Sequence, residues 1–235
     1  GLGRGAGVRL EELKGAFSGR IFILGTGPSL LRLTEWEKAA LSNEYTFGGS
    51  RIWKWDGIGL KFYLVKEQDH VHHMRESGVL NAQAEIARFM LAWQPAPEGW
   101  ISLPVEEYRR VSIAGAGLGR YPYVHQAVSE TLIALQVAIW MGFDRFYFLG
   151  NECTRMGEVW DVKEQRESDI GTMGSDFAAA ARELEGRLFD CTPGGNLSRE
   201  GIVPYMPLAD VFTLPGAEPR GTYLRSLVDA PSEVA

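Results

Sequence analysis

A glycine turn directly after a short apolar segment is the strongest chemical signal in the sequence. Residues 21–24 read Ile-Phe-Ile-Leu and are followed by Gly25-Thr26-Gly27-Pro28-Ser29. A buried strand that ends in Gly-x-Gly lets a ligand approach the backbone closely, and the first N–H groups of a following helix bind phosphate. We expect Ser29 to cap a helix that starts near Leu30, with this turn holding an anionic group. An ordinary strand-turn-helix corner is the alternative, because Gly-x-Gly alone is a weak signal.

Three further segments with the composition of strands also run into glycine, polar or charged residues. They lead into Gly48-Gly49-Ser50-Arg51, into Lys66-Glu67-Gln68-Asp69-His70, and into Gly150-Asn151-Glu152. The carboxyl ends of parallel strands lie along one edge of a sheet, where ligands bind at the switch point between the sheet halves. We therefore expect these polar residues to converge on one crevice.

The charged residues at these ends suggest two kinds of chemistry. Arg51 has a guanidinium that can bind a phosphate with two N–H groups, although a surface arginine is an equal alternative. Glu152 first, and Glu67 or Asp69 next, are candidates for a general base or for ligands of Mg²⁺ on a polyphosphate. Each of these carboxylates, taken singly, also fits a solvated loop.

Two other groups leave their roles open. His70 is a candidate acid-base residue, while the run Asp-His-Val-His-His at 69–73 matches no zinc signature and favours an exposed helix start. Ser129, Glu130 and Thr131 stand at the first turn of an apolar helix, where they either cap the helix or face a ligand. Capping is the default expectation.

The elements that must position these groups alternate between strand and helix. Thr34 and Glu37 have the spacing of a capping box, and Gly142 supplies a helix stop. Helices are expected over Glu35 to Leu41, Asn81 to Trp93, Gln126 to Met141 and Ser175 to Leu188, with loops or lids near 96–122 and 153–174. The pattern predicts an α/β, Rossmann-like, doubly wound and mostly parallel sheet with helices on both faces.

Composition narrows the class of protein. The chain has 235 residues with 45% hydrophobic and 23% charged residues, which favours a single domain over residues 1–213 and a surface-wrapping or flexible tail over 214–235. A net charge of −6 makes nucleic acid an unlikely general partner. We expect no membrane span, since apolar runs fall short of the roughly 20 residues required, and no leader. The two cysteines, Cys153 and Cys191, suit a reducing cytoplasm.

Familiar phosphate motifs are missing from the sequence. The glycine turn is not followed by Gly-Lys-Ser/Thr, so it is not a P-loop, and it lacks the third glycine of a dinucleotide fingerprint. There is also no Asp-x-Asp pair. A nucleotide-sugar transferase built on this chain would manage its diphosphate without that metal clamp.

Several segments resemble the DUF115 family. That family includes archaeal 6-hydroxymethylpterin diphosphokinase-like (MptE-like) proteins and flagellin-modifying motility accessory factors, and it is distantly similar to the bacterial sialyltransferases of glycosyltransferase family 42. The segments that carry the resemblance are residues 23–30, 46–52, 62–65 and 138–152, with a weaker echo in 190–197. Ile-Leu-Gly-Thr-Gly-Pro-Ser-Leu at 23–30 is the most specific of them.

The resemblance implies a Rossmann-like fold with a nucleotide or nucleotide-sugar bound over Gly25 to Ser29. The nucleotide-binding residues that we predict are Gly25, Thr26, Gly27, Pro28, Ser29, Ser50, Arg51, Ser129, Gly150 and Asn151. The chain departs from the family, which usually has Asn at positions 26 and 50 and Gly-x-Asp at 150–152. Family 42 sialyltransferases use a histidine base in the C-terminal region, whereas all four histidines here precede residue 126. Sialyl transfer by that mechanism is therefore not expected.

Three functions follow as hypotheses. The leading one is a nucleotide-dependent transferase, a glycosyltransferase that moves a sugar from a nucleotide-sugar to a hydroxyl, with no certain cofactor. The second is a diphosphokinase that uses Mg-ATP on a small alcohol, with Glu67, Asp69 and Glu152 binding Mg²⁺. The third is a nucleotide-binding module without catalysis. The donor base, the sugar, the acceptor and the oligomeric state stay open.

Overall fold

A seven-stranded parallel sheet organises the chain, in the strand order β10-β7-β2-β3-β4-β5-β6. The computed structural model describes residues 9–80, 84–91, 95–105, 129–153, 157–158, 161–162, 173–216 and 218–219. The strands of this sheet are β2 Arg20–Leu24, β3 Thr46–Gly49, β4 Phe62–Val65, β5 Ala87–Leu91, β6 Ile101–Leu103, β7 Arg145–Leu149 and β10 Leu188–Asp190. Two short antiparallel pairs accompany it, β1 Phe17–Ser18 with β11 Glu218–Pro219, and β8 Gly157–Glu158 with β9 Asp161–Val162.

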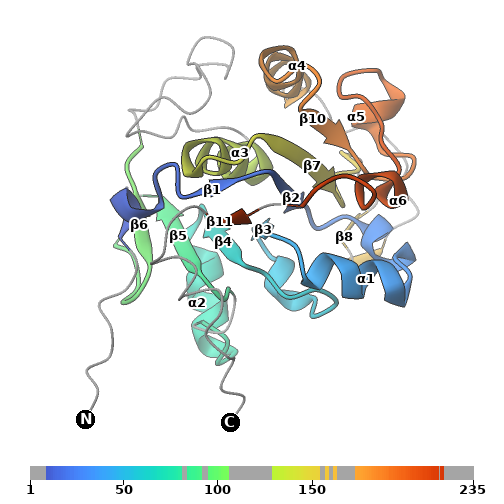
Figure 1. Ribbon diagram of the computed structural model, residues 1–235. Coiled ribbons are helices and arrows are strands. Elements are labelled where there is room, and N and C mark those ends of the chain that lie inside the picture. The colour runs from blue at the N-terminus through green and yellow to red at the C-terminus, as the bar shows by residue number, and fades with distance from the viewer. Residues whose placement is uncertain are drawn as a thin grey trace.

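Helices cover both faces of the sheet (Figure 1). One face packs against α3 Glu130–Met141, α4 Met173–Glu183 and the 3₁₀ helix η1 Leu10–Leu13. The other face packs against the 3₁₀ helices η2 Pro28–Arg32 and η3 Ile52–Lys54 and against α1 Glu35–Ser42, α2 Gln68–Glu76 and α6 Leu208–Val211. A short helix α5 Asn196–Arg199 follows β10. The fold is the α/β, Rossmann-like, doubly wound arrangement that the sequence predicts.

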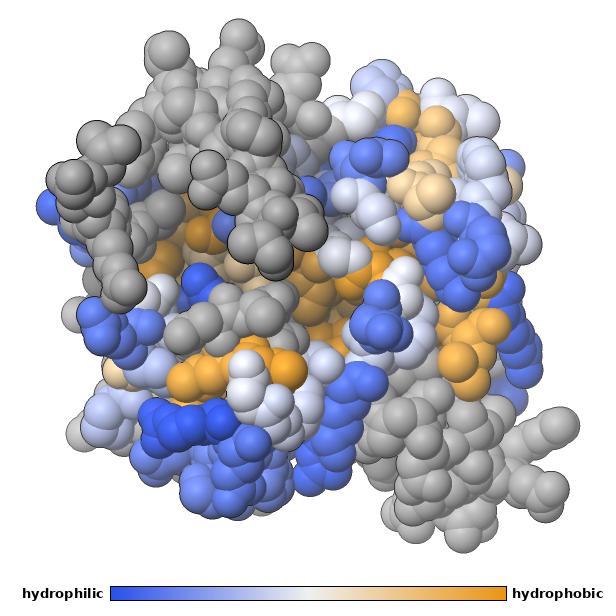
Figure 2. Space-filling view, turned by 90° about the horizontal axis from the view of Figure 1, so that it is seen from below, coloured by the Kyte–Doolittle hydropathy of each residue, from blue (hydrophilic) through white to orange (hydrophobic). Residues whose placement is uncertain are grey.

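Alternation along the strands divides the core between the two faces. Ile21 and Ile23 of β2 pack with α3, whereas Phe22 and Leu24 pack on the opposite face, and each is at most 2% exposed. Successive side chains of a strand point to opposite faces, so a parallel strand buried on both faces is apolar throughout. Figure 2 views the molecule from below, on the side of α1 and α2, and shows apolar residues gathered toward the middle of this face with hydrophilic residues around them.

The order in which strands are added to the sheet reverses between β2 and β7. Strands β2 to β6 follow one another outward in chain order, and β7 then returns to the free side of β2, where Leu24 lies opposite Leu149. The crossover helix α3 ends at Gly142, whose φ of 101° is left-handed, as the helix stop in the sequence predicts. The carboxyl ends of β2 and β7 therefore form the switch point at which this fold binds ligands.

Two helix predictions differ from the structure. The segment expected as a helix from Asn81 to Trp93 contains strand β5, in which Phe89 and Met90 are both fully buried on opposite faces of the sheet. The helix expected from Ser175 to Leu188 is present, but its ends are misplaced, because it runs from Met173 to Glu183. Leu188 instead opens β10, which pairs with β7. In both places, pairing with a neighbouring strand outweighs the local spacing of apolar residues.

Other predictions agree with the structure or lie outside its described residues. Thr34 and Glu37 form the capping box at the start of α1. The loop expected near 96–122 contains β6, and its remainder from 106 onward lies outside the described residues, as do most of 153–174 and of the tail 214–235. Among the described residues, the helices are too short or too polar to cross a membrane.

Candidate functional site

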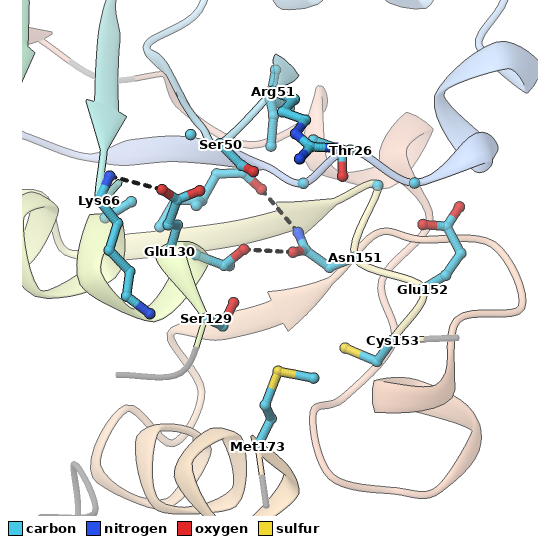
Figure 3. A pocket seen from close by; sticks show the side chains of 18 of the residues that line it. Thr26, Ser50, Arg51, Lys66, Ser129, Glu130, Asn151, Glu152, Cys153 and Met173 are labelled. Carbon is cyan, nitrogen blue, oxygen red and sulfur yellow. Dashed lines mark hydrogen bonds between the residues drawn. The ribbon is translucent and has the colours of Figure 1, made fainter. Parts of the chain in front are cut away.

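A pocket of about 430 Å³ opens at the switch point, where the carboxyl ends of β2, β3, β4 and β7 meet the start of α3 (Figure 3). The predicted site residues that line it are Gly25, Thr26, Gly27, Ser50, Arg51, Glu67, His70, Ser129, Gly150, Asn151 and Glu152. Pro28, Ser29 and Asp69 are predicted site residues that do not line it. The convergence expected from the sequence therefore places most of the predicted residues around one cavity.

Three main-chain N–H groups of the glycine turn bond within the protein, and the binding of phosphate at this turn stays a prediction. Gly25 N–H donates to the Leu149 carbonyl at 2.8 Å, and Gly27 N–H donates to the Gly150 carbonyl at 2.9 Å. Ser29 N–H donates to the Glu152 carboxylate, and Pro28 has no N–H to offer. In this arrangement the turn joins β2 to β7, and these donors do not face a ligand.

Ser29 does not act as a helix cap. The helix after the turn is the 3₁₀ helix η2, which has Pro28 at its first position and no side-chain cap. The Ser29 hydroxyl oxygen is buried and has no hydrogen-bond partner among the described residues. A proline at the first position starts a helix because its φ is already helical, so the cap is not required.

Glu152 has a buried carboxyl group at this turn. Its side chain is only 7% exposed, one oxygen accepts from Ser29 N–H, and the other oxygen lies against Gly27. A Cβ added to Gly27 would lie 1.4 Å from this second oxygen, and a Cβ added to Gly25 would lie 2.3 Å from the Gly150 carbonyl oxygen. Both glycines are therefore required by the close approach of the β7 end, whether or not a ligand is bound.

The segment after β10 forms hydrogen bonds to the backbone of residues 151–153. The Thr192 hydroxyl accepts from Asn151 N–H at 3.1 Å, Asn196 N–H donates to the Glu152 carbonyl at 2.9 Å, and the Asn196 side chain donates to the Cys153 carbonyl at 2.9 Å. Thr192 and Asn196 are fully buried. The segment 190–197, which weakly resembles the family, thus forms the hydrogen-bonded turn that positions the end of β7 at the pocket.

Asn151 lines the pocket, but its side-chain polar atoms are bonded inside the protein. Its amide oxygen accepts from the Thr131 hydroxyl at 2.7 Å, and its amide nitrogen donates to the carbonyls of Ile23 and Leu149 at 3.3 and 3.2 Å. These bonds join β2, β7 and the first turn of α3. The contact of Asn151 with a nucleotide stays a prediction.

Basic groups gather at the β3–β4 side of the pocket. Arg51 follows β3, Lys66 follows β4, and Arg51 Nε donates to His70 Nε2 at 3.4 Å. Burial and the charge of Arg51 lower the pKa of His70. As the acceptor from Arg51, His70 is a neutral imidazole that helps to orient the guanidinium.

Backbone strain is concentrated around the same pocket. Among the described residues, the non-glycine residues with a left-handed backbone are Ser50, with a φ of 54°, and Cys153, with a φ of 49°. Both line the pocket. Such conformations cost free energy and persist where the surrounding structure imposes them, which is common at functional sites.

Glu130 also lines the pocket, although it is not among the site residues predicted from the sequence. It is the first residue of α3, and one of its oxygens accepts from Lys66 N–H at 2.8 Å. Burial raises its pKa to about 7, against smaller lowering effects of the hydrogen bonds from Lys66 and Ser50. The signal in the sequence is its place in the first turn of the most apolar helix, where capping is the default interpretation.

The carboxylates proposed for Mg²⁺ do not form a ligand set. Among the described residues there is no group of three or more His, Cys, Asp or Glu side chains arranged to hold a metal ion. Asp69 is exposed in the first turn of α2 and does not line the pocket. Glu152 is already bound to Ser29. The three carboxylates proposed together for Mg²⁺ therefore do not form one cluster among the described residues.

Comparison with known proteins identifies a shared fold. No protein-family model matches the chain, and no curated protein matches its sequence. The MAf glycosyltransferase of Magnetospirillum magneticum AMB-1 is similar in structure, with a TM-score of 0.53 and 16% identity over 86% of this chain. The match covers 35% of the length of that protein. At this identity the similarity concerns the fold, and it agrees with the Rossmann-like class.

Two structures from Campylobacter jejuni are more weakly similar. The sialyltransferase CstII, solved in complex with a substrate analogue, cytidine-5'-monophosphate, has a TM-score of 0.48 and 14% identity, with 93% of this chain and 92% of that chain covered. An α-2,3-sialyltransferase in its apo form has a TM-score of 0.47 and 14% identity, with 86% and 85% covered. Membership of the DUF115 family stays a prediction from the sequence motifs.

Proposed function

We propose that this chain is a glycosyltransferase that binds a nucleotide-sugar in the switch-point pocket and transfers the sugar to a hydroxyl group. The observation that carries the proposal is the pairing, in one pocket, of the basic side chains of Arg51 and Lys66 with a desolvated carboxyl group, Glu130. Glycosyl transfer needs positive charge for the departing phosphate and a group that takes the proton of the attacking hydroxyl. The pocket offers both.

The phosphate of the donor is best placed at the β3–β4 side of the pocket. The main-chain donors at Gly25, Gly27 and Ser29 bond within the protein, so they are not available to an anion. Arg51 and Lys66 line the opposite side and attract one. The glycine turn then serves as a wall of the pocket, against which the uncharged parts of the nucleotide pack.

The transferase is favoured over the diphosphokinase for two reasons. The carboxylates that would bind Mg²⁺ do not form a ligand set, and the fold is shared with the MAf glycosyltransferase. We also propose that the chain belongs to the DUF115 family, whose motifs its sequence resembles. We further propose a cytoplasmic location, because Cys153 and Cys191 are not joined in a disulfide.

Calorimetric titration of the purified chain tests the binding step. CMP, UDP, GDP, ATP, CMP-N-acetylneuraminate, UDP-glucose and GDP-mannose would be titrated with and without Mg²⁺. We expect at least one sugar nucleotide to bind, and Arg51→Ala to weaken that binding by about 10-fold to 100-fold, since a hydrogen bond to a charged group contributes about 1.5–3 kcal/mol. Lys54→Ala is the matched control, because Lys54 is exposed near Arg51 and does not line the pocket.

Hydrolysis of the bound sugar nucleotide, with water as the acceptor, tests the catalytic step. Release of the free nucleotide at a rate above that of the buffer supports the transferase. Binding of Mg-ATP alone would support the diphosphokinase instead, and binding without turnover would support a non-catalytic module.

A further inference from the structure

Glu130 occupies a fixed position between two strand ends of the pocket. Its carboxyl group accepts from Lys66 N–H, at the end of β4, and its side chain lies beside Gly49, at the end of β3. Figure 3 shows it on the β3–β4 side of the pocket, well apart from Glu152 on the β7 side. The bond from Lys66 N–H therefore holds the carboxyl group beside two neighbouring strand ends, and the carboxylate oxygens keep further lone pairs for another partner.

The surroundings of Glu130 favour reversible proton uptake near neutral pH. Burial raises its pKa to about 7, and the charge of Glu67 raises it as well. Lys66 and Ser50 act in the opposite direction, and Tyr63 beneath it has a pKa raised well above its ordinary value and is neutral. A carboxyl group whose pKa is near the working pH is an efficient proton acceptor.

Charged and titratable groups also face the pocket from the other elements around it. Arg51 follows β3, His70 belongs to α2, and Glu152 follows β7. His70 accepts a hydrogen bond from Arg51 and is neutral, so it adds no charge beside Glu130.

The other candidate bases are less suited. Glu152 is tied to the glycine turn through one oxygen, which accepts from Ser29 N–H, and its other oxygen is buried against Gly27 with no hydrogen-bond partner among the described residues. Glu67 is exposed to solvent, and His70 Nε2 is bonded to Arg51. Glu130 is a partly buried carboxyl group on the pocket wall that is bonded to a main-chain N–H and not to the glycine turn.

We infer that Glu130 is the catalytic base of the transfer and that Glu152 is a positioning residue that ties β7 to β2. The inference rests on the proposed glycosyltransferase function. The acceptor oxygen forms a bond to the anomeric carbon as the bond from that carbon to the phosphate oxygen breaks. The electron pair leaves with the phosphate, near Arg51 and Lys66, and the proton of the acceptor hydroxyl passes to Glu130 and then to water.

The test compares donor binding with turnover in Glu130→Gln, which keeps the size of the side chain and an acceptor for Lys66 N–H. The probes are CMP-N-acetylneuraminate, UDP-glucose and GDP-mannose, with hydrolysis by water as the readout. We expect donor affinity to stay within about 3-fold of the wild type while kcat falls by about 100-fold or more, the usual contribution of a general base. The wild-type kcat should rise with pH through about 7, and this dependence should be lost in Glu130→Gln.

Two further variants separate the possible outcomes. Glu76→Gln, an exposed change at the far end of α2, is the control and should leave kcat unchanged. Glu130→Asp keeps a carboxylate and should recover part of the activity together with its pH dependence. Full kcat in Glu130→Gln, or the same pH dependence in that variant, would overturn the assignment of the base alone. If no sugar nucleotide binds or is hydrolysed by the wild type, the proposed function fails and the base assignment fails with it.

Discussion

The raised pKa of Glu130 predicts a specific dependence of stability on pH. A carboxyl group with an ordinary pKa of 4.5 and a folded-state pKa of about 7 is bound to its proton more tightly in the folded chain than in the unfolded chain. Its contribution to stability is fully present below pH 4.5 and is lost as the pH rises through about 7. The ionised form of Glu130 therefore lowers the free energy of unfolding at neutral and alkaline pH.

The magnitude follows from the size of the shift. The difference between 4.5 and about 7 is 2.5 pKa units. At about 1.4 kcal/mol for each unit, the upper bound on the loss of stability is about 3 kcal/mol. Glu130→Gln removes the ionisation and keeps an acceptor for Lys66 N–H, so this variant should be more stable than the wild type by up to about 3 kcal/mol at pH 8 and nearly equal to it at pH 4.5.

Urea denaturation followed by circular dichroism, at half-unit steps of pH, measures this difference. Glu76→Gln is the matched control, because its side chain is 60% exposed and its removal should give a curve parallel to the wild type. If Glu130→Gln and the wild type also give parallel curves, within about 1 kcal/mol over the whole range, Glu130 has no raised pKa and the argument for a desolvated base is refuted.

Three further changes are informative: two of them test contacts around the pocket, and the third tests a contact that lies away from it. Gly27→Ala places a methyl group against Glu152, so it should destabilise the fold by about 1–3 kcal/mol in urea denaturation. Combined with Glu152→Ala in a double-mutant cycle, it should recover part of this loss, and simple additivity of the two changes would contradict the contact. Thr131→Val removes the donor to the buried Asn151 amide oxygen and should cost about 1–3 kcal/mol by the same assay, whereas an unchanged midpoint would show that this bond is not formed. Thr34→Ala removes the cap of α1 and should cost about 1 kcal/mol, while calorimetric nucleotide affinity stays unchanged.

The fold was predictable where short apolar runs end at turn residues. Residues 21–24, 62–65 and 146–149 are apolar throughout and are bounded by glycine or charged residues, which is typical of strands buried on both faces. Strand β5 was not predictable in this way, because Ile86, Phe89, Met90 and Trp93 also have the spacing of a helix. Its pairing with β4 and β6 made it a strand.

The composition of the site was predictable, but its internal bonding was not. The rule that parallel strand ends meet at the switch point brought together Gly27, Arg51 and Glu152, which are far apart in the sequence. It could not show that Glu152 reaches back to Ser29, or that a cap-like glutamate at position 130 is desolvated in the pocket. These facts depend on the distances between side chains of different elements.

By itself, the sequence determined the elements and the edge of the sheet on which their polar residues lie, because apolar periodicity and turn residues act over a few neighbouring positions. Only the tertiary structure decided which groups are bonded, buried or open to the pocket. Hydrogen bonding and desolvation depend on which side chains the packed sheet and helices bring within a few ångströms of each other. Glu152 and Glu130 are both glutamates at the ends of elements, and packing alone made the first a brace and the second a desolvated carboxyl group in the pocket.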